Sequence, residues 1–202
     1  MLTIFISFFL IFGGTPQDED VLGFNSLYEK DVEYLGLNFS KAKFIGTSHF
    51  TSGKILQEGY MNFWNDFVTN HYHKNNINNA LNIDEMINHN SICGESYKKI
   101  DPYSLITDDP YKLRTDQIQE CMDELEYNSC NKIGICFVVE SFNFNAQTLT
   151  MWFTLVDMNK NQVFFQKKLI TAVGKGKDRD LWANGITKYI SKTLANSSKS
   201  WK

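Results

Sequence analysis

Three consecutive apolar segments in the last third of the chain limit its possible folds most strongly. Residues 133–139 are apolar on both faces, which is typical of a central strand. Residues 148–156 alternate between large apolar and mostly polar side chains, and residues 163–173 form a third segment after a short polar turn. The pattern predicts a three-stranded antiparallel meander over 133–173. One side of its middle strand is expected to face the core through Leu149, Met151, Phe153 and Leu155.

Helical periodicity marks three further segments. Residues 53–70, 115–125 and 178–194 carry apolar side chains three and four positions apart, so each predicts a helix with one buried stripe. A strand is expected over 32–45, where apolar residues alternate around Gly36. The predicted fold class is α+β: a mostly antiparallel sheet with a C-terminal three-stranded meander, and helices packed on one face.

Residues 71–113 are rich in asparagine, histidine and aspartate, and they contain Pro102 and Pro110. Few apolar positions in this stretch are periodic, which predicts an irregular insertion with one short helix near 84–88. Because connections in compact domains are usually short, a loop of this length is expected to contact a ligand.

The N-terminus predicts an export signal. Residues 2–12 read LTIFISFFLIF, and an acidic stretch follows shortly after. Eleven helical residues rise only about 16 Å, whereas a bilayer core measures about 30 Å, so a signal peptide over 1–15 fits better than a membrane span. A buried N-terminal strand or helix is the alternative. A polar linker is then expected over 16–30, a single α+β domain over 31–196, and a short tail over 197–202. The mature protein would be periplasmic, outer-envelope or secreted, without a membrane span.

Composition and charge exclude several classes of partner. With 43% hydrophobic and 21% charged residues, the chain of 202 residues suits one folded domain rather than a disordered chain. The net charge of −3 offers no basic field for nucleic acid. The glycine- and lysine-containing turn at 174–177 matches neither phosphate-binding pattern, G-x-x-x-x-G-K-[ST] or G-x-G-x-x-G, so no cofactor is expected.

Four cysteines are present: Cys93, Cys121, Cys130 and Cys136. In an exported chain they permit disulfides with three possible connectivities. A Cys121–Cys130 bond would close a short loop after a helix. Cys136 lies inside an apolar strand, which favours a small buried hydrophobic residue.

The candidate binding residues are three histidines and one tryptophan. His71 and His73 would share a face on a strand and could together hold zinc, but no third ligand has a diagnostic spacing. Together with His89 they are interpreted as polar loop residues available for binding. Trp152 lies among threonines on the outer side of its strand, so it is either an exposed recognition residue or covered by a helix. No catalytic or metal-binding residue is assigned.

Several segments carry a family resemblance. They are the strand pair at 137–142 and 151–158, the helix start at 180–183, and the segment 37–46. In these residues the chain resembles an uncharacterised family of small exported bacterial proteins. The resemblance implies export and fold, and no activity.

The predicted function is that of an exported or envelope-associated, non-enzymatic domain that binds a protein or a surface component. The basis is that its distinctive residues follow packing periodicities and no catalytic pair stands out. The alternative is a small metal-dependent hydrolase that uses the histidine-rich insertion.

Overall fold

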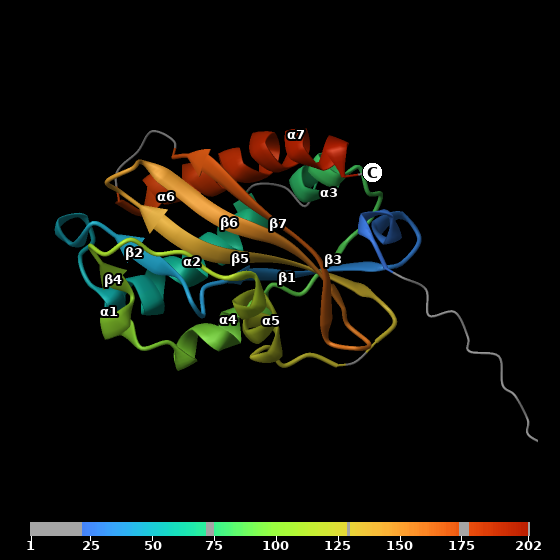
Figure 1. Ribbon diagram of the computed structural model, residues 1–202, viewed down its shortest axis with the longest axis horizontal. Coiled ribbons are helices and arrows are strands. Elements are labelled where there is room, and N and C mark those ends of the chain that lie inside the picture. Colours follow the sequence, from blue (N-terminus) through green and yellow to red (C-terminus); the bar gives the residue numbers. More distant parts are fainter. Residues whose placement is uncertain (1–21, 72–74, 129, 174–177, 202) are drawn as a thin grey trace, which may run out of the picture.

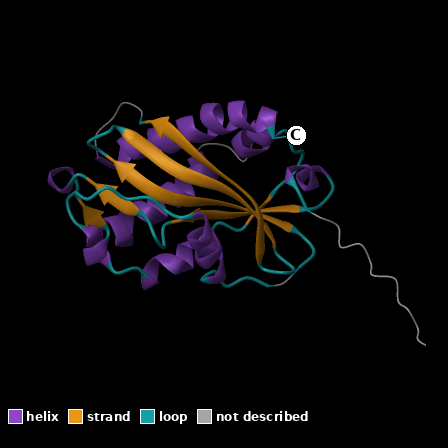
Figure 2. Cartoon of the chain, viewed as in Figure 1, coloured by secondary structure: helices purple, strands orange, loops and turns teal. Residues whose placement is uncertain are grey.

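The computed structural model describes residues 22–71, 75–128, 130–173 and 178–201, which form a mixed seven-stranded sheet with helices on both sides (Figures 1 and 2). The predicted α+β class is therefore confirmed. The strands are β1 (Val32–Asn38), β2 (Lys43–Ile45), β3 (Ile87–Asn88), β4 (Ile106–Thr107), β5 (Ile133–Asn143), β6 (Thr148–Asp157) and β7 (Gln162–Ala172).

Two long helical segments and several short ones surround the sheet. The first runs without interruption through α1 (Gly53–Ile55), η3 (Leu56–Tyr60), α2 (Met61–Asp66) and η4 (Phe67–His71), and the last runs through α6 (Asp178–Lys188), η7 (Tyr189–Leu194), α7 (Ala195–Ser197) and η8 (Ser198–Ser200). The short helices are η1 (Phe24–Tyr28), η2 (Thr47–His49), α3 (Asn75–Leu81), α4 (Ser91–Ser96), η5 (Tyr97–Lys99), η6 (Pro102–Ser104) and α5 (Thr115–Asp123).

Strand β5 is the centre of the sheet. Along one edge it pairs in parallel with β1 over its first half and with β2 over its second half. Strands β3 and β4 continue outward from β1 and β2, also in parallel. The prediction of a mostly antiparallel sheet is therefore wrong. Parallel pairing needs long crossover connections, and the segments between β1 and β5 provide them with helices.

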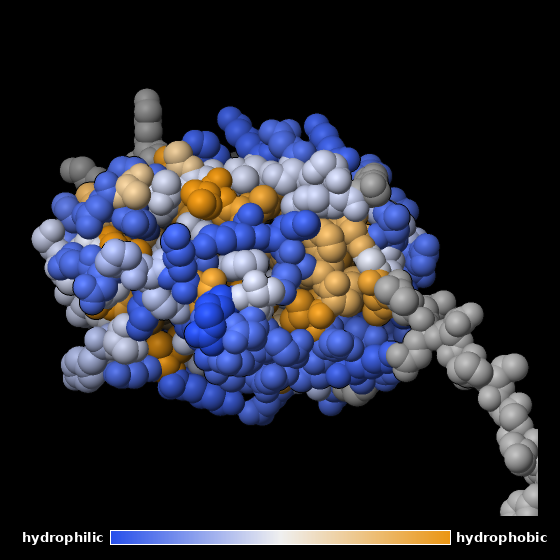
Figure 3. Space-filling model, viewed as in Figure 1, coloured by the Kyte–Doolittle hydropathy of each residue, from blue (hydrophilic) through white to orange (hydrophobic). Residues whose placement is uncertain are grey.

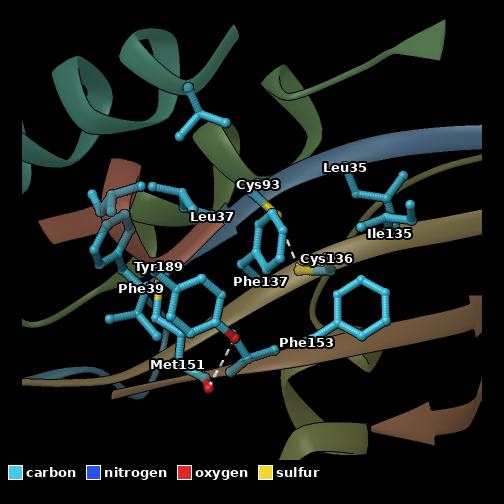
Figure 4. Packing of buried hydrophobic residues seen from close by; sticks show 14 of the residues in the cluster. Leu35, Leu37, Phe39, Cys93, Ile135, Cys136, Phe137, Met151, Phe153 and Tyr189 are labelled. Atoms are coloured by element: carbon cyan, nitrogen blue, oxygen red, sulfur yellow. Dashed lines mark hydrogen bonds between the residues drawn. The ribbon is translucent and has the colours of Figure 1, made fainter. Parts of the chain in front are cut away.

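The other edge of β5 carries antiparallel strands. Strand β6 pairs with β5 and β7 pairs with β6, in a register that places Phe137 opposite Phe153 and Phe153 opposite Lys167. The four residues predicted to face the core are fully buried: Leu149, Met151, Phe153 and Leu155. Tyr189 of η7 donates a hydrogen bond to the carbonyl oxygen of Met151 at 3.2 Å (Figure 4).

Helices cover both faces of the sheet. Phe142 lies on the same face as Leu149. The indole of Trp182 in α6 stacks on the Phe142 ring, with 4.7 Å between the ring centroids. Asn38 points to the opposite face and donates a hydrogen bond to the carbonyl oxygen of Cys121 in α5 at 2.9 Å. The prediction that helices pack on one face is therefore wrong, because strands β1 and β5 are buried on both faces and each face needs a cover.

The described part of 71–113 is more regular than expected. It contains α3, β3, α4 and β4, and β3 stands where a helix was predicted near 84–88. Helix α3 buries Ile77, Ala80 and Leu81 at helical spacing, a short stripe that the surrounding asparagines conceal. The prediction of an irregular insertion is wrong for these residues.

Both ends of the described chain belong to the folded domain. Phe24 and Leu27 of η1 are buried, so 22–30 is not a polar linker. At the other end, Trp201 stacks on Phe153 at 5.4 Å, and the Ser198 hydroxyl donates to the carbonyl oxygen of Ala80. The tail expected over 197–202 is therefore packed as far as residue 201. The predicted signal peptide over 1–15 lies outside the described residues.

No helix in the described part of the chain is long and apolar enough to cross a bilayer. On the face seen in Figure 3, hydrophilic residues surround smaller hydrophobic areas.

Candidate functional site

An open groove of about 710 Å³ lies at the end of the sheet where β1 and β5 begin. We call it the Glu33 groove, after the buried carboxylate in its wall. Its lining consists of Glu33, His89, Ile92, Leu125, Glu126, Tyr127, Asn128, Cys130, Lys132 and Met158.

Three neighbouring strands bring three charged or polar side chains into contact in this groove. Glu33 is the second residue of β1 and pairs with Gly134 of β5 on one side and Ile87 of β3 on the other. His89 directly follows β3, and its backbone N–H donates to the carbonyl oxygen of Tyr34 at 2.9 Å. Lys132 directly precedes β5. The sheet register therefore places His89 and Lys132 on either side of Glu33.

Both carboxylate oxygens of Glu33 are occupied. Oε2 lies 2.8 Å from Nδ1 of His89, and Oε1 accepts a hydrogen bond from the Lys132 ammonium group. The Glu33 side chain is 4% exposed, whereas those of Lys132 and His89 are 27% and 50% exposed. The carboxylate is thus enclosed, and its two partners remain accessible from the groove.

The electrostatics favour an ionised Glu33. Burial by itself raises the pKa of this carboxyl group, but the hydrogen bonds from Lys132 and His89 and their charges outweigh it, so the net pKa is lowered. The same hydrogen bond raises the pKa of Lys132. An ionised carboxylate only accepts hydrogen bonds, so Nδ1 of His89 carries the proton in this contact. In the neutral imidazole Nε2 is then an acceptor, and no described residue forms a hydrogen bond with it.

This arrangement is suited to binding. A carboxylate that holds one imidazole nitrogen fixes the orientation of the ring and directs the other nitrogen outward. Cys130 lines the same groove, and no hydrogen bond joins its sulfur to His89 in the described structure. Among the described residues, no group of three or more His, Cys, Asp and Glu side chains is arranged to hold a metal ion.

Replacing Glu33 by glutamine should lower the free energy of unfolding by about 1–3 kcal/mol at pH 7, since the ionised acceptor of two hydrogen bonds is lost. The folded-state pKa lies below the ordinary value of 4.5, so the stabilisation is complete above that pH and is lost as the pH falls through the folded-state pKa. Urea unfolding at pH 7 and pH 3 should show the two proteins converging at the lower pH. Glu126→Gln, at a carboxylate 88% exposed, is the control and should change stability by less than about 0.5 kcal/mol. Equal stability of Glu33→Gln and the wild type at pH 7 would contradict the assignment of Glu33 as an ionised acceptor of two hydrogen bonds.

The predicted histidines are only partly located. His89 lies in the Glu33 groove. His73 lies outside the described residues. His71 is the last residue of η4, and its side chain is not among those described, so the predicted His71–His73 pair stays a prediction.

Trp152 has a structural role that the sequence left open. Its indole N–H donates to Oε2 of the buried Glu140 at 3.0 Å, and Lys168 donates to Oε1 of the same carboxylate at 2.6 Å. The Lys168 ammonium group also lies 5.6 Å from the centre of the indole. Trp152 is half-buried and pairs with Val138 in the middle of β5, away from the strand start where the Glu33 groove lies. The indole N–H therefore provides one of the hydrogen bonds to the buried Glu140 carboxylate.

Sequence reasoning missed the buried carboxylates of Glu33 and Glu140. Glu33 and Glu140 each interrupt an otherwise apolar strand, and that isolated charge was the available signal. Buried carboxylates require partners, but the partners Lys132, His89 and Lys168 come from other strands or from the residues beside them.

Comparison with family models, with curated proteins and with solved structures finds no match for the chain.

Proposed function

We propose that this protein is an exported or envelope-associated, non-enzymatic binding domain, and that the Glu33 groove receives a peptide segment of a partner protein or surface component. The observation that carries the proposal is the enclosed Glu33 carboxylate, whose two partners, Lys132 and His89, are accessible from an open groove.

The hydrogen-bonding groups of the groove fit a peptide bond. The Lys132 ammonium group has three N–H donors, of which Glu33 takes one, so it can donate to a carbonyl oxygen. In its neutral form, the His89 imidazole can accept from an amide N–H through Nε2. The half-buried side chains of Ile92 and Tyr127 provide apolar contact beside these groups. A peptide segment supplies a carbonyl, an N–H and apolar side chains together, which neither an inorganic anion nor a plain hydrocarbon does.

Peptide selection on the purified protein tests the groove directly. Random heptapeptides displayed on phage are selected on the wild type, and the affinities of the resulting synthetic peptides are measured by calorimetry. His89→Ala and Lys132→Met should each weaken binding about tenfold, which corresponds to the loss of one hydrogen bond. His49→Ala is the matched control, because His49 is an exposed histidine stacked on Phe144 outside the groove.

Two outcomes would contradict the proposal. In one, the selected peptides bind both groove variants as tightly as the wild type. In the other, no peptide is enriched. Thermal unfolding of each variant, followed by circular dichroism, must first show that it is folded.

The export part of the proposal rests on the apolar run at 2–12, the acidic stretch that follows it, and the resemblance to exported bacterial proteins. The N-terminal sequence of the protein recovered from its native cells tests it. A mature chain that begins after about residue 15 and lies outside the cytoplasm is expected. A cytoplasmic chain that still begins at Met1 would rule export out.

A further inference from the structure

Two buried cysteines meet where helix α4 packs on the sheet. Sγ of Cys93, in α4, lies 3.7 Å from Sγ of Cys136, in the central strand β5 (Figure 4). Both residues are fully buried, and 43 positions separate them along the chain. Figure 4 shows the two sulfur atoms pointing toward each other beside Phe137.

A glycine in β1 makes this approach possible. Gly36 pairs with Cys136 at a register shift in β1, and its φ of +115° lies in the region that glycine tolerates best. A Cβ atom at this position would lie 2.9 Å from the Cβ of Cys93. The missing side chain lets α4 lie directly against β1, so that Cys93 reaches past this strand to β5.

The other two cysteines are placed differently. Cys121 is buried in α5, and Cys130 lines the Glu33 groove. The sequence also permits a Cys121–Cys130 bond that would close a short loop, but among the described residues the contact between cysteine sulfurs joins Cys93 and Cys136.

We propose that Cys93 and Cys136 form a disulfide when the chain folds in an oxidising compartment, and that this bond attaches α4 to the central strand. The ability to pair rests on the geometry alone. Its occurrence in the cell rests on the proposed export, because disulfides persist outside the reducing cytosol.

The reaction is an exchange with an external disulfide, such as oxidised glutathione or the disulfide of an oxidoreductase. The thiolate of one cysteine attacks a sulfur of the oxidant, a mixed disulfide forms, and one oxidant thiolate leaves. The thiolate of the second cysteine then attacks the protein sulfur of the mixed disulfide and releases the second oxidant thiolate. The two cysteine protons end on the two released thiols, so two cysteines are oxidised and one disulfide is reduced.

The bond must form before α4 closes over β5. Both thiols are inaccessible in the folded chain, and burial raises the pKa of the Cys136 thiol well above its usual range. A buried thiol with a raised pKa is inert toward exchange. The reduced protein, once folded, should therefore resist the oxidant that acts on the folding chain.

Refolding of the purified protein in a glutathione redox buffer tests the proposal without dependence on localisation. The reduced, urea-unfolded chain is diluted into oxidised and reduced glutathione, quenched with acid, unfolded again and alkylated. Intact mass should show two alkylated cysteines of the four, and peptide mapping should identify a Cys93–Cys136 linked pair. The oxidised protein should unfold at a higher urea concentration than the reduced protein, because the bond restricts the unfolded chain.

Variants identify the pair independently. Cys130→Ser should retain the linked peptide, and Cys93→Ala should abolish it. Four alkylated cysteines in the refolded wild type, or a linked Cys121–Cys130 peptide, would overturn the proposal, and neither result requires any variant to fold. If the reduced, already folded protein is oxidised as fast as the refolding chain, the disulfide does not need to form during folding, and that part of the proposal is overturned. Failure of peptide binding to the Glu33 groove would leave these thiol measurements unaffected, so the two proposals are judged separately.

Discussion

Phe153→Ala should lower the free energy of unfolding by about 3–5 kcal/mol, the range typical of a fully buried phenylalanine. Phe153 lies in the middle of β6 and is completely buried. Its ring centroid lies within 6.3 Å of those of Phe24, Phe137, Phe165 and Trp201. The side chain thus joins η1, strands β5 and β7 and the C-terminal Trp201, and alanine would leave a cavity between them.

Urea unfolding followed by far-ultraviolet circular dichroism measures this effect. Ile170→Ala is a suitable control, because Ile170 lies on the adjacent strand β7 and is 58% exposed. We expect the control to cost less than about 1 kcal/mol, since little apolar area is lost from the interior. A loss below about 1 kcal/mol for Phe153→Ala would show that this residue is not part of the core.

Gly36→Ala should destabilise the protein by about 2–5 kcal/mol, the sum of backbone strain at positive φ and overpacking. The backbone at Gly36 has a φ of +115°, and an added Cβ would lie 2.8 Å from Oδ1 of Asn65 and 2.9 Å from the carbonyl oxygen of Asn90. Asn65 cannot move freely, because its side chain bridges Leu37 and Asn90 by hydrogen bonds of 2.9 and 2.7 Å.

Gly59→Ala provides a control of opposite sign. Gly59 lies in η3 within the first long helical segment, and apart from its neighbours in the same helix no atom lies within 4 Å of the Cβ that alanine would add. Alanine is a better helix former than glycine, so the free energy of unfolding of this variant should rise by about 0.5–1 kcal/mol. The same urea titration compares the two variants, and a Gly36→Ala protein as stable as the wild type would disprove the close packing of α4 on β1.

The longer elements were predictable because their patterns are local. The strand expected over 148–156 is observed as β6, Thr148–Asp157, and its apolar positions face the core. The helical stripes at 53–70 and 115–125 also correspond to helices. In each case a periodic row of apolar side chains must be buried, and that requirement can be read from neighbouring residues alone.

The short strands were not predictable in this way. Strands β3 and β4 have two residues each, and they exist because their backbones pair with β1 and β2. Two residues carry no period, and parallel pairing joins segments that lie far apart in the chain. This is why the sheet was expected to be mostly antiparallel, and why 71–113 was expected to be irregular.

The sequence by itself determined the α+β class, the positions of the long strands and helices, and the buried row of apolar side chains in β6, because all of these follow from local periodicity. Only the tertiary structure decided the candidate site and the cysteine pair. His89 and Lys132 are 56 and 99 positions from Glu33, and Cys93 is 43 positions from Cys136. Contacts over such distances depend on sheet register and on the close approach that Gly36 permits, and the residues adjacent in sequence do not identify the distant partner.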